Sequence, residues 1–107
     1  TPLIESCIKG YENIVKLLID NGAYINYSDY WNQTPLIEAC RKGYENIVKL
    51  LIENGASVNI PGKYGHTPLT NGHVCLIEAC CHENENIVKL LIENGADVNK
   101  ENKYGYT

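Results

Sequence analysis

The sequence predicts an all-α fold, a solenoid of helix–turn–helix units joined by hairpin loops, on the strength of three observations. The tripeptide Thr-Pro-Leu starts at Thr1, Thr34 and Thr67, and another Thr stands at position 107, so the spacings are 33, 33 and 40. Each unit holds two short runs of apolar residues with helical periodicity. Turn-forming Gly, Asn and Pro follow these runs. A fixed period of this length indicates a repeat array and not an ordinary enzyme core.

The first helix of the second unit is predicted to run to about Lys42. Thr34 is a typical N-cap, and Pro35 suits the first helical position because no N–H is needed there. Gly43 can adopt the positive φ that ends a helix. The predicted core positions of this helix carry apolar or small side chains, and they are Leu36, Ala39 and Cys40.

The second helix of this unit is predicted from about Glu45 to Asn54, where Asn54-Gly55 stops it. The polar stretch that follows, up to His66, predicts a hairpin between units. One pair of short helices cannot bury its apolar face alone, so the units must stack to form a continuous core. The apolar face of the second helix consists of Ile47, Val48, Leu50, Leu51 and Ile52.

The whole chain, 1–107, is predicted to be a single domain. Its units span 1–33, 34–66 and 67–106, and a fourth begins at 107. The third unit is seven residues longer, and we expect an insertion near 67–73 to bulge out as a lengthened finger. Because the first unit has a full apolar helix face and no polar cap, we expect a fragment of a longer array.

The repeated residues resemble the ankyrin repeat family over essentially the whole chain. In the second unit the resemblance rests on Thr34-Pro35-Leu36, Ala39, Gly43, the run 47–51 and Asn54-Gly55-Ala56, and the same pattern recurs in the flanking units. The resemblance implies an ankyrin-repeat solenoid. It also implies a non-catalytic module that binds another protein through its hairpin tips and the concave face of its first helices.

Two departures from the family pattern bear on the structure. The His that usually follows Thr-Pro-Leu is Ile4 in the first unit and Ile37 in the second, so its hydrogen bonds are missing. The residue pair between the helices, Gly-Tyr in the first two units, becomes Glu83-Asn84 in the third. A Glu at positive φ is unfavourable, so we expect this turn to be altered or strained.

The aromatic residues provide the best indication of a binding surface. Seven of the nine lie in the inter-unit hairpins, where Tyr and Trp offer large contact area at low entropic cost. The resemblance assigns partner contacts to the hairpin tips and to the exposed face of the first helices. The predicted partner-binding residues are Tyr30, Trp31, Gln33, Arg41, Lys42, Lys63, Tyr64, His66, His73, Cys81, His82, Tyr104 and Tyr106.

No catalytic residue, cofactor or metal site is predicted. All three His share the third unit with three Cys, but their spacing is not that of a zinc site. Cys80 recurs in register with Cys7 and Cys40, which predicts a core position. Glu38 recurs in register with Glu5, and such a ladder of acids is typical of a solvated helix face.

Charge and cysteine content narrow the partners and the compartment. The net charge of -4 argues against nucleic acid and against an anionic membrane. No apolar run reaches the ~20 residues that a spanning helix needs. Five Cys without disulfide-type spacing, and no signal segment, indicate an intracellular and, we expect, cytoplasmic protein. We expect a monomer that binds another protein. The alternative is a structural spacer or regulatory segment of a larger multidomain protein.

Overall fold

A computed structural model of the chain describes residues 1–29, 33–58, 79–80 and 83–96. Within these ranges the secondary structure is helical and contains no strand, which confirms the predicted all-α fold. The helices bounded in the described ranges are α1 (Pro2–Lys9), α2 (Glu12–Asp20), α3 (Pro35–Lys42), α4 (Glu45–Glu53) and α6 (Glu85–Glu93).

The first helix of each of the first two units starts and ends as predicted. In α3, the Ile37 N–H donates to Oγ1 of Thr34 at 3.2 Å, and Thr1 caps α1 in the same way. Both helices carry Pro in the first turn. They end at Gly10 and Gly43, whose φ angles are 75° and 76°. The Thr cap and the terminal Gly therefore set both ends of the helix locally.

The second helices share one sequence and one way of ending. Helix α4 ends at Glu53, and the Asn54 side chain donates from Nδ2 to the Leu50 carbonyl at 2.8 Å. The same bond recurs at the ends of α2 and α6, so at each end the Asn side chain adds a second hydrogen bond to a carbonyl that also accepts from the backbone N–H of that Asn. The buried residues of α4 are Ile47, Val48 and Leu51.

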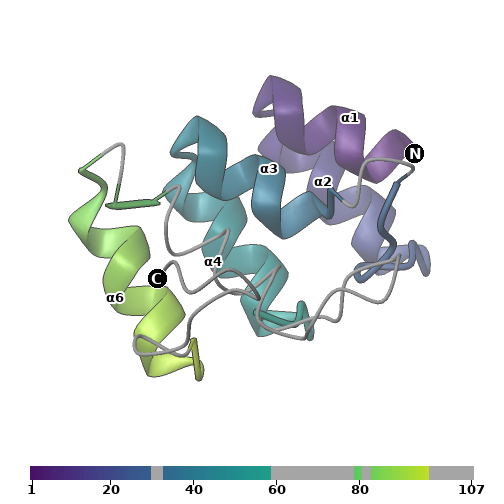
Figure 1. The fold of residues 1–107 in the computed structure, drawn as a ribbon. Helices are drawn as coiled ribbons and strands as arrows, with labels where there is room; N and C mark the ends of the chain where they lie inside the picture. The colour runs from purple at the N-terminus through teal and green to yellow at the C-terminus, as the bar shows by residue number, and fades with distance from the viewer. Residues whose placement is uncertain (30–32, 59–78, 81–82, 97–107) are drawn as a thin grey trace.

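The helix pairs stack side by side, as Figure 1 shows. Helix α1 packs against α3, α2 packs against α4, and α4 packs against α6. The core therefore runs continuously from unit to unit. Its fully buried members include both first-helix and second-helix residues: Cys7, Val15, Ala39, Cys40, Val48, Leu51, Ala79, Ile87 and Leu91.

The turn before α6 is strained, as the sequence predicts. Glu83 has a φ of 54° and is the one positive-φ residue other than Gly in the described ranges. This conformation costs an L-residue ~1–2 kcal/mol. Asn84 compensates, because its Oδ1 accepts from the Ile87 N–H at 3.4 Å and its Nδ2 donates to the Gly43 carbonyl at 3.4 Å.

The insertion expected near 67–73 lies outside the described residues and stays a prediction. None of the helices in the described part of the chain is long and apolar enough to cross a membrane.

Candidate functional site

The first hairpin is closed by two hydrogen bonds between Asp29 and Gln33. The Asp29 N–H donates to the Gln33 carbonyl at 2.9 Å, and the Gln33 N–H donates to Oδ1 of Asp29 at 3.0 Å. Asn26 links this hairpin to the next unit, because its Nδ2 donates to the Gly55 carbonyl at 3.2 Å and its Oδ1 accepts from the Ser57 N–H at 2.9 Å. Gln33, a predicted partner-binding residue, is therefore held in place directly before α3.

Arg41 joins this hairpin to the first helix of the second unit. Its Nη2 donates to Oε1 of Gln33 at 2.8 Å, and its Nη1 forms an ion pair with Oε1 of Glu38 at 3.0 Å. The guanidinium remains partly exposed, whereas Glu38 is almost covered. The structure thus brings two predicted partner-binding residues, Gln33 and Arg41, together. It also fixes the direction in which the Arg41 guanidinium points.

The prediction that Glu38 lies on a solvated face is wrong. Glu38 is 7% exposed, although its repeat equivalent Glu5 is exposed. A carboxylate can be buried when a guanidinium pairs with it, and Arg41 supplies that partner. The corresponding residue in α1 is Ile8, which cannot form an ion pair, so the first unit has no equivalent arrangement.

Lys42 is exposed at the end of α3, next to Arg41. Two cations in the last turn of a helix interact favourably with its negative carbonyl end. Lys42 is therefore accessible to solvent, and its contact with a partner stays a prediction. The other predicted partner-binding residues lie outside the described ranges and stay predictions: Tyr30, Trp31, Lys63, Tyr64, His66, His73, Cys81, His82, Tyr104 and Tyr106.

The described thiols differ in their surroundings. Burial, and to a smaller extent the charge of Glu38, raises the pKa of the Cys7 thiol from 9.0 to about 12, so Cys7 stays protonated and unreactive near neutral pH. Cys40 is also buried. Cys80 is exposed, so its predicted core position is wrong. Helix α3 packs against α1, which carries Cys7.

A metal site finds no support in the part of the chain that the structure describes, where no three His, Cys, Asp or Glu side chains gather. All three His, with Cys75 and Cys81, lie outside that part, so the expectation of no zinc in the third unit stays a prediction.

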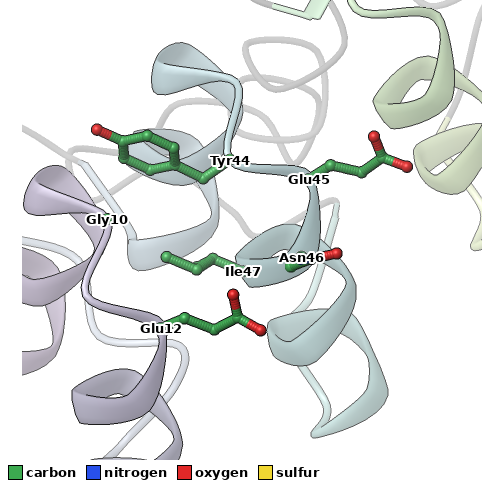
Figure 2. Close-up of a pocket in the computed structure, with 6 residues that line it drawn as sticks. All are labelled: Gly10, Glu12, Tyr44, Glu45, Asn46 and Ile47. Atoms are coloured by element: carbon green, nitrogen blue, oxygen red, sulfur yellow. The ribbon is translucent and has the colours of Figure 1, made fainter.

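A cleft of about 260 Å³ lies where the first two units meet. Figure 2 shows the Tyr44 ring extending from the turn between α3 and α4 toward Gly10, with Glu12 and Ile47 below it. Glu45 points away from this cleft toward the next helix. The polar lining consists of carboxylates, an amide and a phenol, with no nucleophile held by a base among these residues. The cleft thus offers contact groups and no arrangement for nucleophilic catalysis.

An apolar groove of about 290 Å³ lies at the other edge of the first unit. Tyr24 and Tyr27 of the hairpin form one side, and both rings are exposed. The sequence identifies these rings as hairpin aromatics but does not show that they border a groove. The remaining lining residues come from the start of α1, from α2 and from the segment after α2: Thr1, Pro2, Leu3, Leu18 and Ala23.

Comparisons with known proteins agree with this architecture. A family model described as ankyrin repeats, in three copies, matches residues 1–62. The chain belongs to the ankyrin repeat family. A model of a single ankyrin repeat also matches residues 71–103. Ankyrin repeats generally mediate protein–protein interaction and are generally non-catalytic.

A solved structure of similar shape supports the same fold. The crystal structure of the human ASB11 ankyrin repeat domain matches with a TM-score of 0.77 and 35% sequence identity. The match covers 94% of this chain and 42% of that domain, so this ankyrin array spans less than half of its solved relative. The comparison confirms the ankyrin-repeat solenoid. A search of curated proteins finds no match.

Proposed function

We propose that this ankyrin array is a non-catalytic scaffold that binds a partner protein through its hairpin tips and the concave face of its first helices. The observation that carries the proposal is the position of Arg41, which is held by Gln33 of the hairpin and Glu38 of α3. An Arg side chain fixed before binding loses little entropy on contact, and Arg is enriched among residues that dominate binding energy.

The described part of the first hairpin supports the same surface. Tyr24 and Tyr27 are exposed, and the sequence places Tyr30 and Trp31 further along the same hairpin. Exposed aromatic rings and a held guanidinium are both groups that suit protein contact. We further propose that binding takes place inside the cell, where free thiols such as the exposed Cys80 stay reduced.

The experiment is affinity capture from cell extract with quantitative mass spectrometry, using the wild-type chain and the variants Arg41→Ala and Tyr30→Ala/Trp31→Ala. For proteins that bind the proposed surface, the captured amount should fall by about tenfold or more with either variant. A loss of this size is typical when a dominant contact is truncated. The matched control is Lys49→Ala, which removes an exposed cation from the second-helix side.

The outcomes separate the proposal from the structural spacer. If the captured proteins depend on Arg41 and the aromatic pair but not on Lys49, the proposal holds. If no captured protein responds to either variant, the surface assignment is wrong and a structural spacer becomes the better account.

A further inference from the structure

The dipeptide Asn-Gly follows each of the second helices that the structure describes, α2, α4 and α6. Asn is a thermolabile residue. It is most labile before Gly, because the backbone nitrogen of a residue without a side chain can reach the carbonyl carbon of the Asn side chain. The proposed binding surface uses none of these pairs. Their residues are all exposed: Asn21-Gly22, Asn54-Gly55 and Asn94-Gly95.

The Asn54-Gly55 pair has room for an intramolecular reaction. Apart from the chain neighbours of Gly55, no heavy atom of the described residues lies within 4 Å of the point where a Cβ on Gly55 would stand. The Gly55 nitrogen forms a bond to Cγ of Asn54 while the bond from Cγ to Nδ2 breaks, and ammonia leaves with the Gly55 proton. Water then opens the cyclic imide at one of its carbonyl carbons. The product at position 54 is an aspartate or an isoaspartate, whose backbone runs through the side chain.

Two hydrogen bonds within the second unit hold the pair away from this reaction. The Asn54 Nδ2 donates to the Leu50 carbonyl at 2.8 Å, and the Gly55 N–H donates to the Ile52 carbonyl at 3.1 Å. Both donor groups take part in the reaction, so both bonds must break first. Helix ends open locally at a free energy below that of global unfolding. The reaction rate therefore depends on how often this end of α4 opens.

Asn26 of the first hairpin restrains the same end of α4. Its Nδ2 donates to the Gly55 carbonyl at 3.2 Å, and its Oδ1 accepts from the Ser57 N–H at 2.9 Å. These two bonds form the Asn26 clip. We propose that Asn54 is a site of spontaneous deamidation, that the Asn26 clip limits its rate, and that the reaction in turn releases the clip. The reaction needs water and no partner protein.

The chemistry of the products explains the release. A carboxylate at position 54 cannot donate to the Leu50 carbonyl, and its charge lies at the negative end of α4. Isoaspartate also adds a carbon to the backbone before Gly55. This addition moves Gly55 relative to α4 and away from the Asn26 side chain. Deamidation thus loosens the attachment of the first hairpin to the second unit.

Peptide mapping by mass spectrometry, after the purified chain has stood at neutral pH, tests whether Asn54 reacts. Position 54 should convert to aspartate and isoaspartate, and the reaction should run faster in urea, where the chain is unfolded. Asn46 is the matched control, because it is equally exposed but lies inside α4 and precedes the β-branched Ile47. The proposal is overturned if Asn54 keeps its amide as long as Asn46 does, or if folding does not slow the reaction.

Two variants of Asn26 test the clip. Asn26→Ala should speed the reaction at Asn54 by about fivefold, because the bonds it removes each favour the closed helix end. Asn26→Asp keeps the acceptor for the Ser57 N–H, so its effect should be smaller. Asn94 ends α6 with the same 2.8 Å bond, and its rate should not change. Equal acceleration at Asn54 and Asn94, or none at either, overturns the role of the clip.

Hydrogen exchange at the Ser57 amide tests the release. Protein modified at position 54 is separated by anion exchange and identified by peptide mapping. Its Ser57 N–H should exchange about threefold faster than in fresh protein, or more, because the bond to Asn26 is lost. Asn54→Gln is the control, since a Gln side chain forms the corresponding imide far more slowly. If the modified protein exchanges Ser57 as slowly as this variant, deamidation does not open the clip and the proposal fails.

Discussion

The two junctions between units share their helix packing and differ in the turn. At both, an Ile of the later second helix is buried against the earlier one. At the first junction, the Tyr44 ring covers Gly10. At the second, the Asn84 side chain takes the place of the ring, caps its own helix and donates to the Gly43 carbonyl.

This difference separates two physical tasks. The apolar layer between second helices lets any two units stack, because all three helices carry the same apolar side chains. The turn residues add selectivity, because a Cβ in place of Gly10 would stand 2.9 Å from the Tyr44 ring and force the ring to shift. Stacking strength and neighbour choice can therefore be changed independently in this array.

The largest expected effect concerns the shared apolar layer. Ile47→Ala and Ile87→Ala should each lower the free energy of unfolding by ~2–5 kcal/mol, because both side chains are fully buried. The equivalent change at the exposed Ile14 should cost less than about 1 kcal/mol. Urea unfolding measures all three. Equal losses at Ile14 and Ile47 would show that burial by the preceding unit is not what distinguishes them.

The next effect distinguishes the two junctions. Gly10→Ala should cost ~2–4 kcal/mol, which combines the positive φ with the contact to the Tyr44 ring. Gly43→Ala should cost only ~1–2 kcal/mol, since the nearest atom, Nδ2 of Asn84, lies 3.2 Å from the added Cβ and can shift. Thermal unfolding compares the two variants. If Gly43→Ala lost more stability than Gly10→Ala, the first junction would not be the more closely packed of the two.

A pH effect follows from Cys7, which the second unit buries at the first junction. Its pKa is raised from 9.0 to about 12, so above pH 9 the unfolded chain loses this proton while the folded chain keeps it. Stability is therefore full below pH 9 and falls by up to ~1.4 kcal/mol per pH unit as the pH rises toward 12. Between pH 8 and 10.5, the free energy of unfolding should fall less steeply with pH for Cys7→Ala than for the wild type. An unchanged slope would mean that the fold does not raise the pKa of this thiol.

The smallest effect concerns the cap at the second junction. Asn84→Ala removes the side-chain acceptor of the Ile87 N–H and should cost ~0.5–2 kcal/mol. Asn84→Ser keeps an acceptor at the helix start, so it should cost only a few tenths of a kcal/mol. Urea unfolding of both variants measures the difference. Equal losses would assign the role of Asn84 to its bond with Gly43 and not to the cap.

Local signals in the sequence predicted most of the fold. Thr34 and Gly43 bracket the first helix, and the second helix ends at Glu53, one residue before the predicted end. Each of these signals acts within a few residues, so one unit contains them all. Burial was harder to predict. Cys80 has the same local sequence position as Cys40, but Cys40 is buried and Cys80 is exposed, because burial depends on contacts between elements and not on the local sequence alone.

The candidate site could be predicted only in part. Gln33 and Arg41 were both expected on the binding surface, and their direct hydrogen bond joins two elements eight residues apart. The buried Glu38 was missed, although its spacing of three residues from Arg41 on a helix was a signal for an ion pair. Arg41 also donates to Gln33, which precedes the helix, and no periodic pattern encodes that contact.

The most direct test of the difference between the junctions is a double-mutant cycle that combines Gly10→Ala with Tyr44→Ala. When the ring is removed, Gly10→Ala should lower the free energy of unfolding by a smaller amount. The coupling energy between the two changes should therefore reach about 1 kcal/mol or more. The same cycle at Gly43 and Asn84 supplies the comparison, and there the coupling should be smaller. If the Gly10 and Tyr44 changes add within ~0.5 kcal/mol, the ring does not select for glycine and the account of neighbour choice is contradicted.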